Sequence, residues 1–149
     1  MINPKTTKEL GIAVHPELLS LANGSRVLLD AAHNPEGARA LRTYLARWHP
    51  ERPSLLVSIM RDKDVDAILR ELLPVTSSVI ATAAKTPRAM PANELASRVR
   101  ALDATRAVVA CEDASAAIDA AVARSATVCV AGSIFMAGEV RERLCTLPR

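Results

Sequence analysis

Aromatic residues are almost missing from this sequence of 149 residues, in which one Trp, one Tyr and one Phe make up 2%. A surface for single-stranded nucleic acid needs aromatic rings on which bases can stack, so this scarcity argues against that class of function. The net charge is only +3, and the 19 Lys and Arg residues are scattered along the chain. We therefore expect a solvated surface rather than a footprint for DNA.

Long apolar runs are also missing: none approaches the length of about 20 residues that a membrane-spanning helix requires. No charged segment followed by an apolar one marks a secretion signal, so we expect a cytoplasmic protein without a membrane anchor. The three cysteines show no CxxC spacing. Cys111 and Cys129 lie in apolar runs, and we expect both to be buried, reduced thiols.

Several motifs that carry chemistry are absent from the sequence. It contains neither GxxxxGK[ST] nor GxGxxG, the loops by which a chain holds a triphosphate or a dinucleotide unaided. It contains no HExxH and no pair of Cys or His residues at the spacing of a zinc site, so we assign no metal ligand. The GxSxG turn of serine hydrolases is missing as well.

What the sequence does contain is enough apolar material for a folded core, with 50% hydrophobic residues and a mean hydropathy of +0.14. Residues 1–16 are polar and interrupted by prolines, and we interpret them as a linker or a cut end. Residues 17–149 form the expected domain. The apolar runs 17–21 and 26–30 flank Asn23-Gly24, a typical hairpin signal, which predicts an antiparallel strand at the edge of a sheet.

Strand-like and helix-like segments then alternate along the chain. The strand-like runs are nearly all apolar, which is typical of parallel strands covered on both faces. The alternation predicts an α/β fold with a mostly parallel sheet of about six strands between two layers of helices. The expected strands are 26–30, 54–60, 77–82, 106–111 and 126–131, and the expected helices are about 35–47, 64–73, 91–102, 113–124 and 134–145.

Ligands of open parallel sheets bind beyond the carboxyl ends of the strands, so the residues that follow each strand are the candidates for a site. Cationic side chains beside helix N-termini favour anions, because free backbone N–H groups add to their charge. The candidates for carboxylate or phosphate recognition are Lys63, Arg88 and Ser133. After the first parallel strand, Asp30 suits a ribose hydroxyl or a cation-bound water, and His33 suits a phosphate or acyl-phosphate oxygen.

Each candidate also has a purely structural interpretation. Asp30 and Asn34 can cap the turn and the helix that follow them, and His33 can make a local hydrogen bond. Lys63 can belong to a solvated turn, and Ser133 can simply begin a helix. Only their convergence at one edge of the sheet would favour a binding site.

Four ordered stretches of the chain resemble the C-terminal domain of the folylpolyglutamate synthase/dihydrofolate synthase family, in the Mur ligase superfamily. The run Val27–Pro35, VLLDAAHNP, carries much of the resemblance. The segment Ala131–Val140, AGSIFMAGEV, is similar to the family's Gly-Ser-Leu-Tyr-Leu-x-Gly-Glu-Val ending. Between them, Ser58–Asp64 resembles a Gly-x-x-x-Asp-Lys-Asp turn, and Thr86–Ala89 with Glu94-Leu95 resembles a Pro-Arg-Ala…Glu-Leu segment.

The resemblance implies a Rossmann-like domain of an ATP- and Mg²⁺-dependent ligase that joins L-glutamate to a folate or dihydropteroate carboxylate through an acyl-phosphate. The phosphate loop, most magnesium ligands and the folate pocket would belong to an N-terminal ATPase domain, with which this domain would close over the nucleotide. The family precedent also implies a monomer. Carried onto this sequence, the family implies ATP contacts for Asp30 and His33, a catalytic place for His33 near the transferring phosphate, and glutamate-carboxylate contacts for Asn34, Lys63, Arg88 and Ser133.

Three departures from the family pattern bear on function. The N-terminal ATPase domain is absent from this sequence, so we expect the isolated chain to be inactive. The Pro-Gly-Arg stretch before the first strand, whose Arg helps to bind nucleotide, has no match, and Ser58 stands where a Gly is usual. Two alternatives are the same domain from another Mur-type amino-acid ligase, and a stand-alone, non-catalytic α/β module that binds an anion or a protein partner.

Overall fold

A six-stranded sheet organises the chain, and the computed structural model describes residues 16–146 of it. Strand β1 is antiparallel to β2, and the other neighbouring strands pair in parallel in the order β1-β2-β6-β3-β4-β5. The strands are β1 (Glu17–Ser20), β2 (Arg26–Leu29), β3 (Ser54–Val57), β4 (Val79–Ala83), β5 (Val108–Asp113) and β6 (Thr127–Ala131). The fold is therefore the mostly parallel α/β sheet with an antiparallel edge strand that the sequence predicts.

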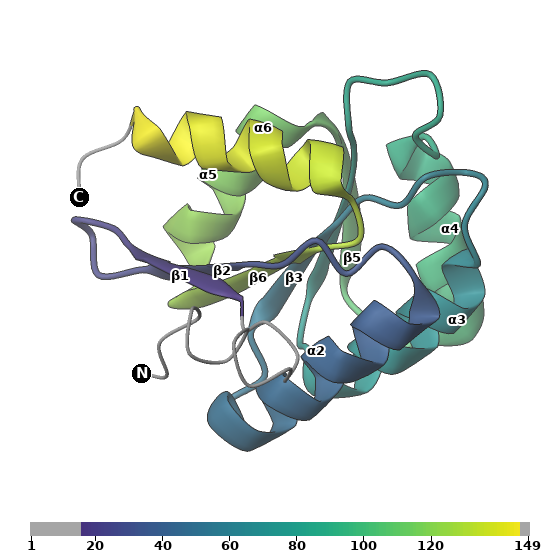
Figure 1. Ribbon diagram of the computed structural model, residues 1–149, viewed down its shortest axis with the longest axis horizontal. Coiled ribbons are helices and arrows are strands. Elements are labelled where there is room, and N and C mark those ends of the chain that lie inside the picture. Colours follow the sequence, from purple (N-terminus) through teal and green to yellow (C-terminus); the bar gives the residue numbers. More distant parts are fainter. Residues whose placement is uncertain (1–15, 147–149) are drawn as a thin grey trace, which may run out of the picture.

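Helices cover both faces of this sheet (Figure 1). On one face α2 (Pro35–Trp48), α3 (Val65–Leu72) and α4 (Ala92–Leu102) bury residues such as Leu41, Leu69 and Leu95. On the other face α5 (Ala114–Arg124) and α6 (Ile134–Cys145) bury residues such as Ile118 and Val140. The core therefore has two apolar layers, one on each side of the sheet.

Side-chain caps fix where α2, α3 and α5 begin, at the residues that the sequence indicates. Asn34 and Asp64 accept hydrogen bonds from Gly37 N and Ala67 N at the starts of α2 and α3. Asp113 does the same for α5 by accepting from Ala116 N. Such caps satisfy backbone donors that have no partner within the helix. Because each of these helices follows a strand, the caps hold its first turn at the carboxyl edge of the sheet.

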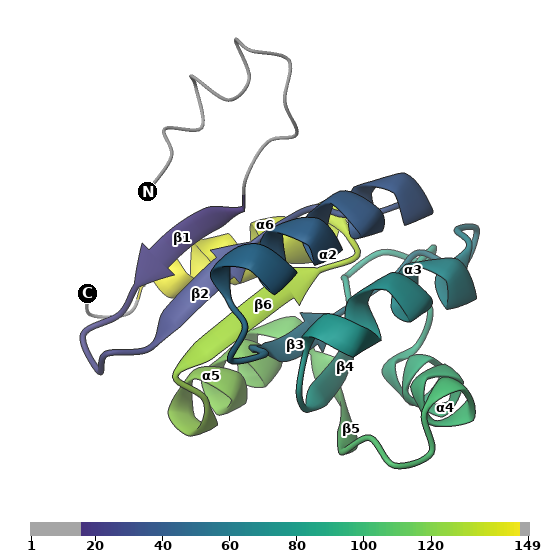
Figure 2. The same cartoon turned by 90° about the horizontal axis from the view of Figure 1, so that it is seen from below.

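The two outer strands, β1 and β5, lie at opposite ends of the sheet (Figure 2) and differ in how well they are covered. In β1, Leu19 is buried, whereas β5 has no fully buried residue and its Val109 is 50% exposed. The interpretation of the apolar runs as strands covered on both faces is therefore wrong for β5, whose Val109 and Ala110 stay exposed. Cys111 of β5 is accordingly half-buried rather than buried, whereas Cys129 in the central strand β6 is fully buried.

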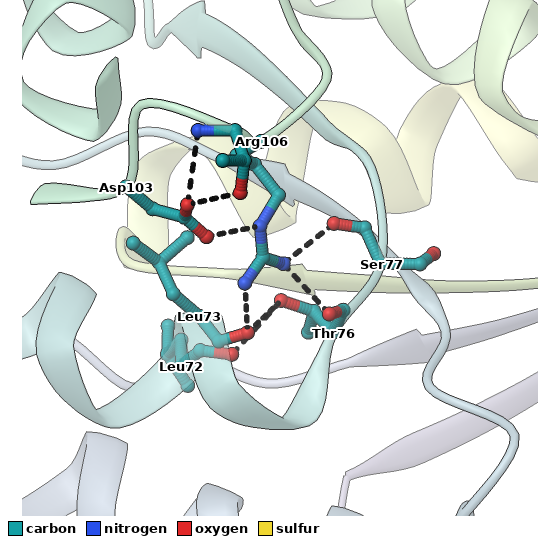
Figure 3. Close-up of polar contacts among 7 residues, drawn as sticks. Leu72, Leu73, Thr76, Ser77, Asp103 and Arg106 are labelled. Carbon is teal, nitrogen blue, oxygen red and sulfur yellow. Dashed lines mark hydrogen bonds and ion pairs between the residues drawn. The ribbon is translucent and has the colours of Figure 1, made fainter.

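At the opposite edge of the sheet, where the strands begin, Arg106 joins several segments (Figure 3). Arg106 donates to Asp103 and to three backbone carbonyls, those of Leu73, Thr76 and Ser77, at distances of 2.6 to 3.1 Å. These carbonyls lie in and after the short 3-10 helix η1 (Leu73–Val75), which extends α3 and was not predicted. The guanidinium thus joins the end of α3 to the turn before β5.

Candidate functional site

The carboxyl ends of β2, β6 and β3 meet because these strands are neighbours in the sheet. Asp30, just after β2, donates its backbone N–H to the carbonyl of Val130 in β6 at 2.9 Å. Ser58, just after β3, donates its backbone N–H to the carbonyl of Ala131 at 3.3 Å. The turns that follow the three strands therefore lie side by side, as the parallel topology requires.

Strand β1 contributes to the same edge with its first residue, since it runs against the other strands. Glu17 pairs in register with Leu29, one residue before Asp30. Together Glu17, Asp30, His33, Asn34 and Gly37 line an open hollow of about 470 Å³. Glu17 was not among the predicted site residues, because we considered only residues that follow strands. The Asn-Gly hairpin signal, which predicts an antiparallel β1, could have identified it.

Asp30 is a half-buried carboxyl at the wall of this hollow. Burial raises its pKa from 3.8 to about 6, and a hydrogen bond with the backbone of Ala32 opposes part of that increase. The rise follows from the cost of placing a charge where water is partly excluded. At neutral pH the carboxylate is still mostly ionised, and it is poorly hydrated, so it is well suited to accept hydrogen bonds from a ligand.

His33 is oriented by its own turn. Its Nδ1 lies 2.9 Å from the carbonyl oxygen of Ala31, and because a carbonyl can only accept, this nitrogen carries the hydrogen. In the neutral ring Nε2 is then an acceptor, and protonation makes it a donor. The local hydrogen bond that the purely structural interpretation predicts is therefore present. It orients the imidazole ring beside the hollow and leaves Nε2 able to contact a ligand.

Asn34 and Ser133 each cap a helix at this edge. Asn34 Oδ1 accepts from Gly37 N at 2.7 Å, and the buried Ser133 Oγ accepts from Met136 N at 3.2 Å at the start of α6. In both caps the side-chain oxygen only accepts a hydrogen bond. The amide NH₂ of Asn34 and the hydroxyl hydrogen of Ser133 are donors beyond those caps, next to helix N-termini that favour anions.

Gly132 lets β6 end in close contact with the turn after β3. Its φ is +105°, and a Cβ at this position would lie 2.3 Å from the carbonyl oxygen of Ser58. The buried hydroxyl of Ser58 in turn accepts from Ala84 N at 3.2 Å, just after β4. The serine that replaces the expected glycine therefore ties the ends of β3 and β4 together.

Lys63 and Arg88 lie on two loops that are joined to each other. Met60 and Ala89 form an antiparallel bridge, and Arg61 N donates to the carbonyl of Arg88 at 2.7 Å. The Arg88 guanidinium pairs with the Asp62 carboxylate at 3.0 Å, and both side chains are more than half exposed. Neither Lys63 nor Arg88 lines the hollow that contains Asp30 and His33. The structure thus brings Asp30, His33 and Asn34 together, and it places Lys63 and Arg88 on a neighbouring pair of loops.

Within residues 16–146, no group of three or more His, Cys, Asp or Glu side chains is placed to hold a metal ion. No helix in this part of the chain is long and apolar enough to cross a membrane.

A mostly parallel sheet between two helical layers, with polar turns gathered at its carboxyl edge, defines a Rossmann-like α/β domain. The model of one family, described as "Mur ligase, glutamate ligase domain", matches residues 17–134, and the chain belongs to that family.

Individual relatives agree with this assignment. Over 71 residues the chain is 46% identical to the dihydrofolate synthase/folylpolyglutamate synthase of Mycobacterium tuberculosis, a match that covers 47% of this chain and 15% of that protein. The folylpolyglutamate synthase of the same organism, solved with ADP and AMPPCP, superposes with a TM-score of 0.78 at 31% identity, over 93% of this chain and 34% of that one. That of Thermotoga maritima gives 0.76 at 37% identity, over 87% and 30%. The chain thus spans about a third of the length of these solved relatives.

Proposed function

We propose that this chain is the glutamate-binding domain of an ATP-dependent folate polyglutamate ligase, and that it closes over the nucleotide held by a second domain. The main observation behind this proposal is that Asp30, His33 and Asn34 line one hollow at the carboxyl edge of the sheet. These three residues lie in Val27–Pro35, one of the two stretches that carry most of the resemblance to the ligase family. The family match and the synthases among the relatives support the same substrate class.

In this proposal, anionic groups bind where donors converge. Asn34 and Ser133 offer an amide and a hydroxyl beside the N-termini of α2 and α6, and these donors suit the carboxylates of glutamate. Lys63 adds a cation from the neighbouring loop. The Arg88 guanidinium uses only Nη2 on the Asp62 carboxylate, so its remaining N–H donors can bind a glutamate carboxylate beside that pair.

The nucleotide side of the site fits Asp30 and His33. ATP would supply the phosphoryl group that activates the folate carboxylate, and its Mg²⁺ would be held mainly by the second domain. The Asp30 carboxylate suits a ribose hydroxyl, because burial leaves it poorly hydrated. His33, oriented through Nδ1, would place Nε2 toward a phosphate oxygen and, when protonated, stabilise developing negative charge there. Closure would exclude water that could otherwise hydrolyse an acyl-phosphate.

Turnover by the ligase that contains this chain tests the proposal. We expect His33→Ala to lower kcat for ATP-dependent glutamate addition by about a hundredfold, with little change in KM for folate, because charge stabilisation acts in the transition state. We expect Lys63→Ala mainly to raise KM for glutamate.

Arg124→Ala is the matched control for these two variants. Arg124 is an exposed cation in the last turn of α5, at the edge of the sheet where the strands begin. An unchanged kcat in His33→Ala would show that His33 makes only its local hydrogen bond and takes no part in the reaction. A ligase that adds no glutamate to folates, or that uses a different amino acid, would contradict the proposed substrate class.

A further inference from the structure

Two adjacent apolar side chains are exposed in the first turn of α6. Ile134 is 58% exposed and Phe135 is 55% exposed. Within residues 16–146 the other large exposed hydrophobic residues are Trp48 and Val109, each on a different element. Isolated exposed hydrophobic residues are normal on a protein surface, but a neighbouring pair at the edge of a candidate site needs a reason.

The packing of α6 gives no reason for the pair. This helix packs on the sheet through Met136, Val140 and Leu144, which are fully buried. Ile134 and Phe135 immediately follow the capping residue Ser133 and lie outside that stripe. A polar residue at either position would serve the fold equally well, because neither is part of the buried layer.

The exposed pair lies on the helix that also contacts the first strand, where the preceding part of the chain enters the domain. Strand β1 is antiparallel, so Glu17 lies at the carboxyl edge of the sheet, and any polypeptide that precedes the domain arrives there. Glu17 also forms an ion pair with Arg141 of α6. Residues seven apart lie on the same side of a helix, about 10 Å along it, so Arg141 and Ile134 share one side of α6. The point of entry is therefore anchored to the helix that carries the pair.

We propose that Ile134 and Phe135 form the surface onto which the nucleotide-binding domain of the ligase closes, and that they meet an apolar patch there. The inference rests on the proposed function and names the partner surface for the closing step. The matched part is about a third of the solved relatives, so such a ligase has a second, larger part that can reach this edge. Tethering at Glu17 keeps that part at high local concentration, so a small apolar contact suffices for reversible closure.

The test compares Ile134→Ser/Phe135→Ser with Trp48→Ser in the complete ligase. Trp48 is 48% exposed at the end of α2, at the edge of the sheet where strands begin, and so it matches the pair in exposure but not in place. Closure is measured by small-angle X-ray scattering with AMPPCP and glutamate, and turnover is measured in parallel. We expect the double variant to lose the nucleotide-dependent decrease in radius of gyration and at least tenfold in kcat/KM for ATP. We expect Trp48→Ser to retain both.

The outcomes separate this inference from the proposed function. A double variant that closes and turns over like Trp48→Ser would overturn the role of the pair while leaving the ligase activity established. An unmodified ligase that adds no glutamate would contradict the proposed function instead. Because both side chains are exposed, we expect the melting temperature of the double variant to stay close to that of the unmodified protein, and that measurement distinguishes lost closure from lost folding.

Discussion

Asp30 shows how a single residue links the candidate site to stability. Its carboxyl is half-buried, and the raised pKa means that the folded protein binds a proton more tightly there than the unfolded chain does. Asp30 therefore favours folding below pH 3.8, and this contribution is lost as the pH rises to about 6. At neutral pH the partly buried carboxylate therefore lowers the free energy of unfolding. A residue retained for stability alone would not do so, which agrees with a role in binding.

We predict that Asp30→Asn becomes progressively more stable than the unmodified protein as the pH rises from 4 to 7. The difference should grow by at most about 3 kcal/mol, because each unit of pKa corresponds to about 1.4 kcal/mol. Urea unfolding of both proteins at several pH values measures it. A difference that stays constant over this range would show that Asp30 is not desolvated in the folded protein.

At the scale of elements, the candidate site depends on how closely the ends of neighbouring strands approach each other. Gly132 is the clearest case, since it combines a left-handed φ with the 2.3 Å that would separate a Cβ from the carbonyl oxygen of Ser58. Any side chain there pushes the start of α6, with Ser133, away from the turn that leads to Lys63. Gly138, on the same helix, has no atom within 4 Å of such a Cβ.

We predict opposite effects for alanine at these two glycines. Gly132→Ala should destabilise the fold by about 3 kcal/mol, because the strained backbone and the contact with Ser58 add together. Gly138→Ala should stabilise it by about 0.5–1 kcal/mol, because alanine favours the helix. Chemical unfolding of the two variants gives both values. Equal effects would mean that the close approach at Gly132 is relieved by backbone movement.

At the scale of the whole molecule, the proposed reaction is divided between two parts. The sequence has no phosphate loop, and the described edge offers donors for carboxylates and for a few oxygens of a nucleotide. Positioning a triphosphate requires several converging contacts and a metal ion. The fold can therefore hold one side of the reaction centre, and closure would have to supply the other.

We accordingly predict that the 149-residue chain by itself hydrolyses no ATP and binds glutamate weakly at best. Calorimetric titration with ATP and with glutamate, together with a phosphate-release assay, checks this. Tight ATP binding by the chain alone would contradict the division of labour and would favour an independent nucleotide-binding module.

Local signals predicted much of this structure from the sequence. Asn23-Gly24 predicted the hairpin of β1 and β2, and the caps Asn34 and Asp64 predicted where α2 and α3 begin. The order of strand-like and helix-like runs predicted the layers. The boundaries were less accurate: the run 54–60 ends as a strand at Val57, because the turn after it bends across to meet the loop after β4.

By itself, then, the sequence determined the elements and the class of fold, because caps, turns and apolar periods are properties of neighbouring residues. The family followed from the resemblance of four ordered motifs. Only the tertiary structure decided that Glu17 joins Asp30 and His33, that Arg88 is paired with Asp62, and that Ile134 and Phe135 are left uncovered. Those facts depend on contacts between residues far apart in the chain, whose partners no local pattern specifies. The physical reason is that a site at the edge of a parallel sheet is assembled by strand order, and strand order is set by packing of the whole core.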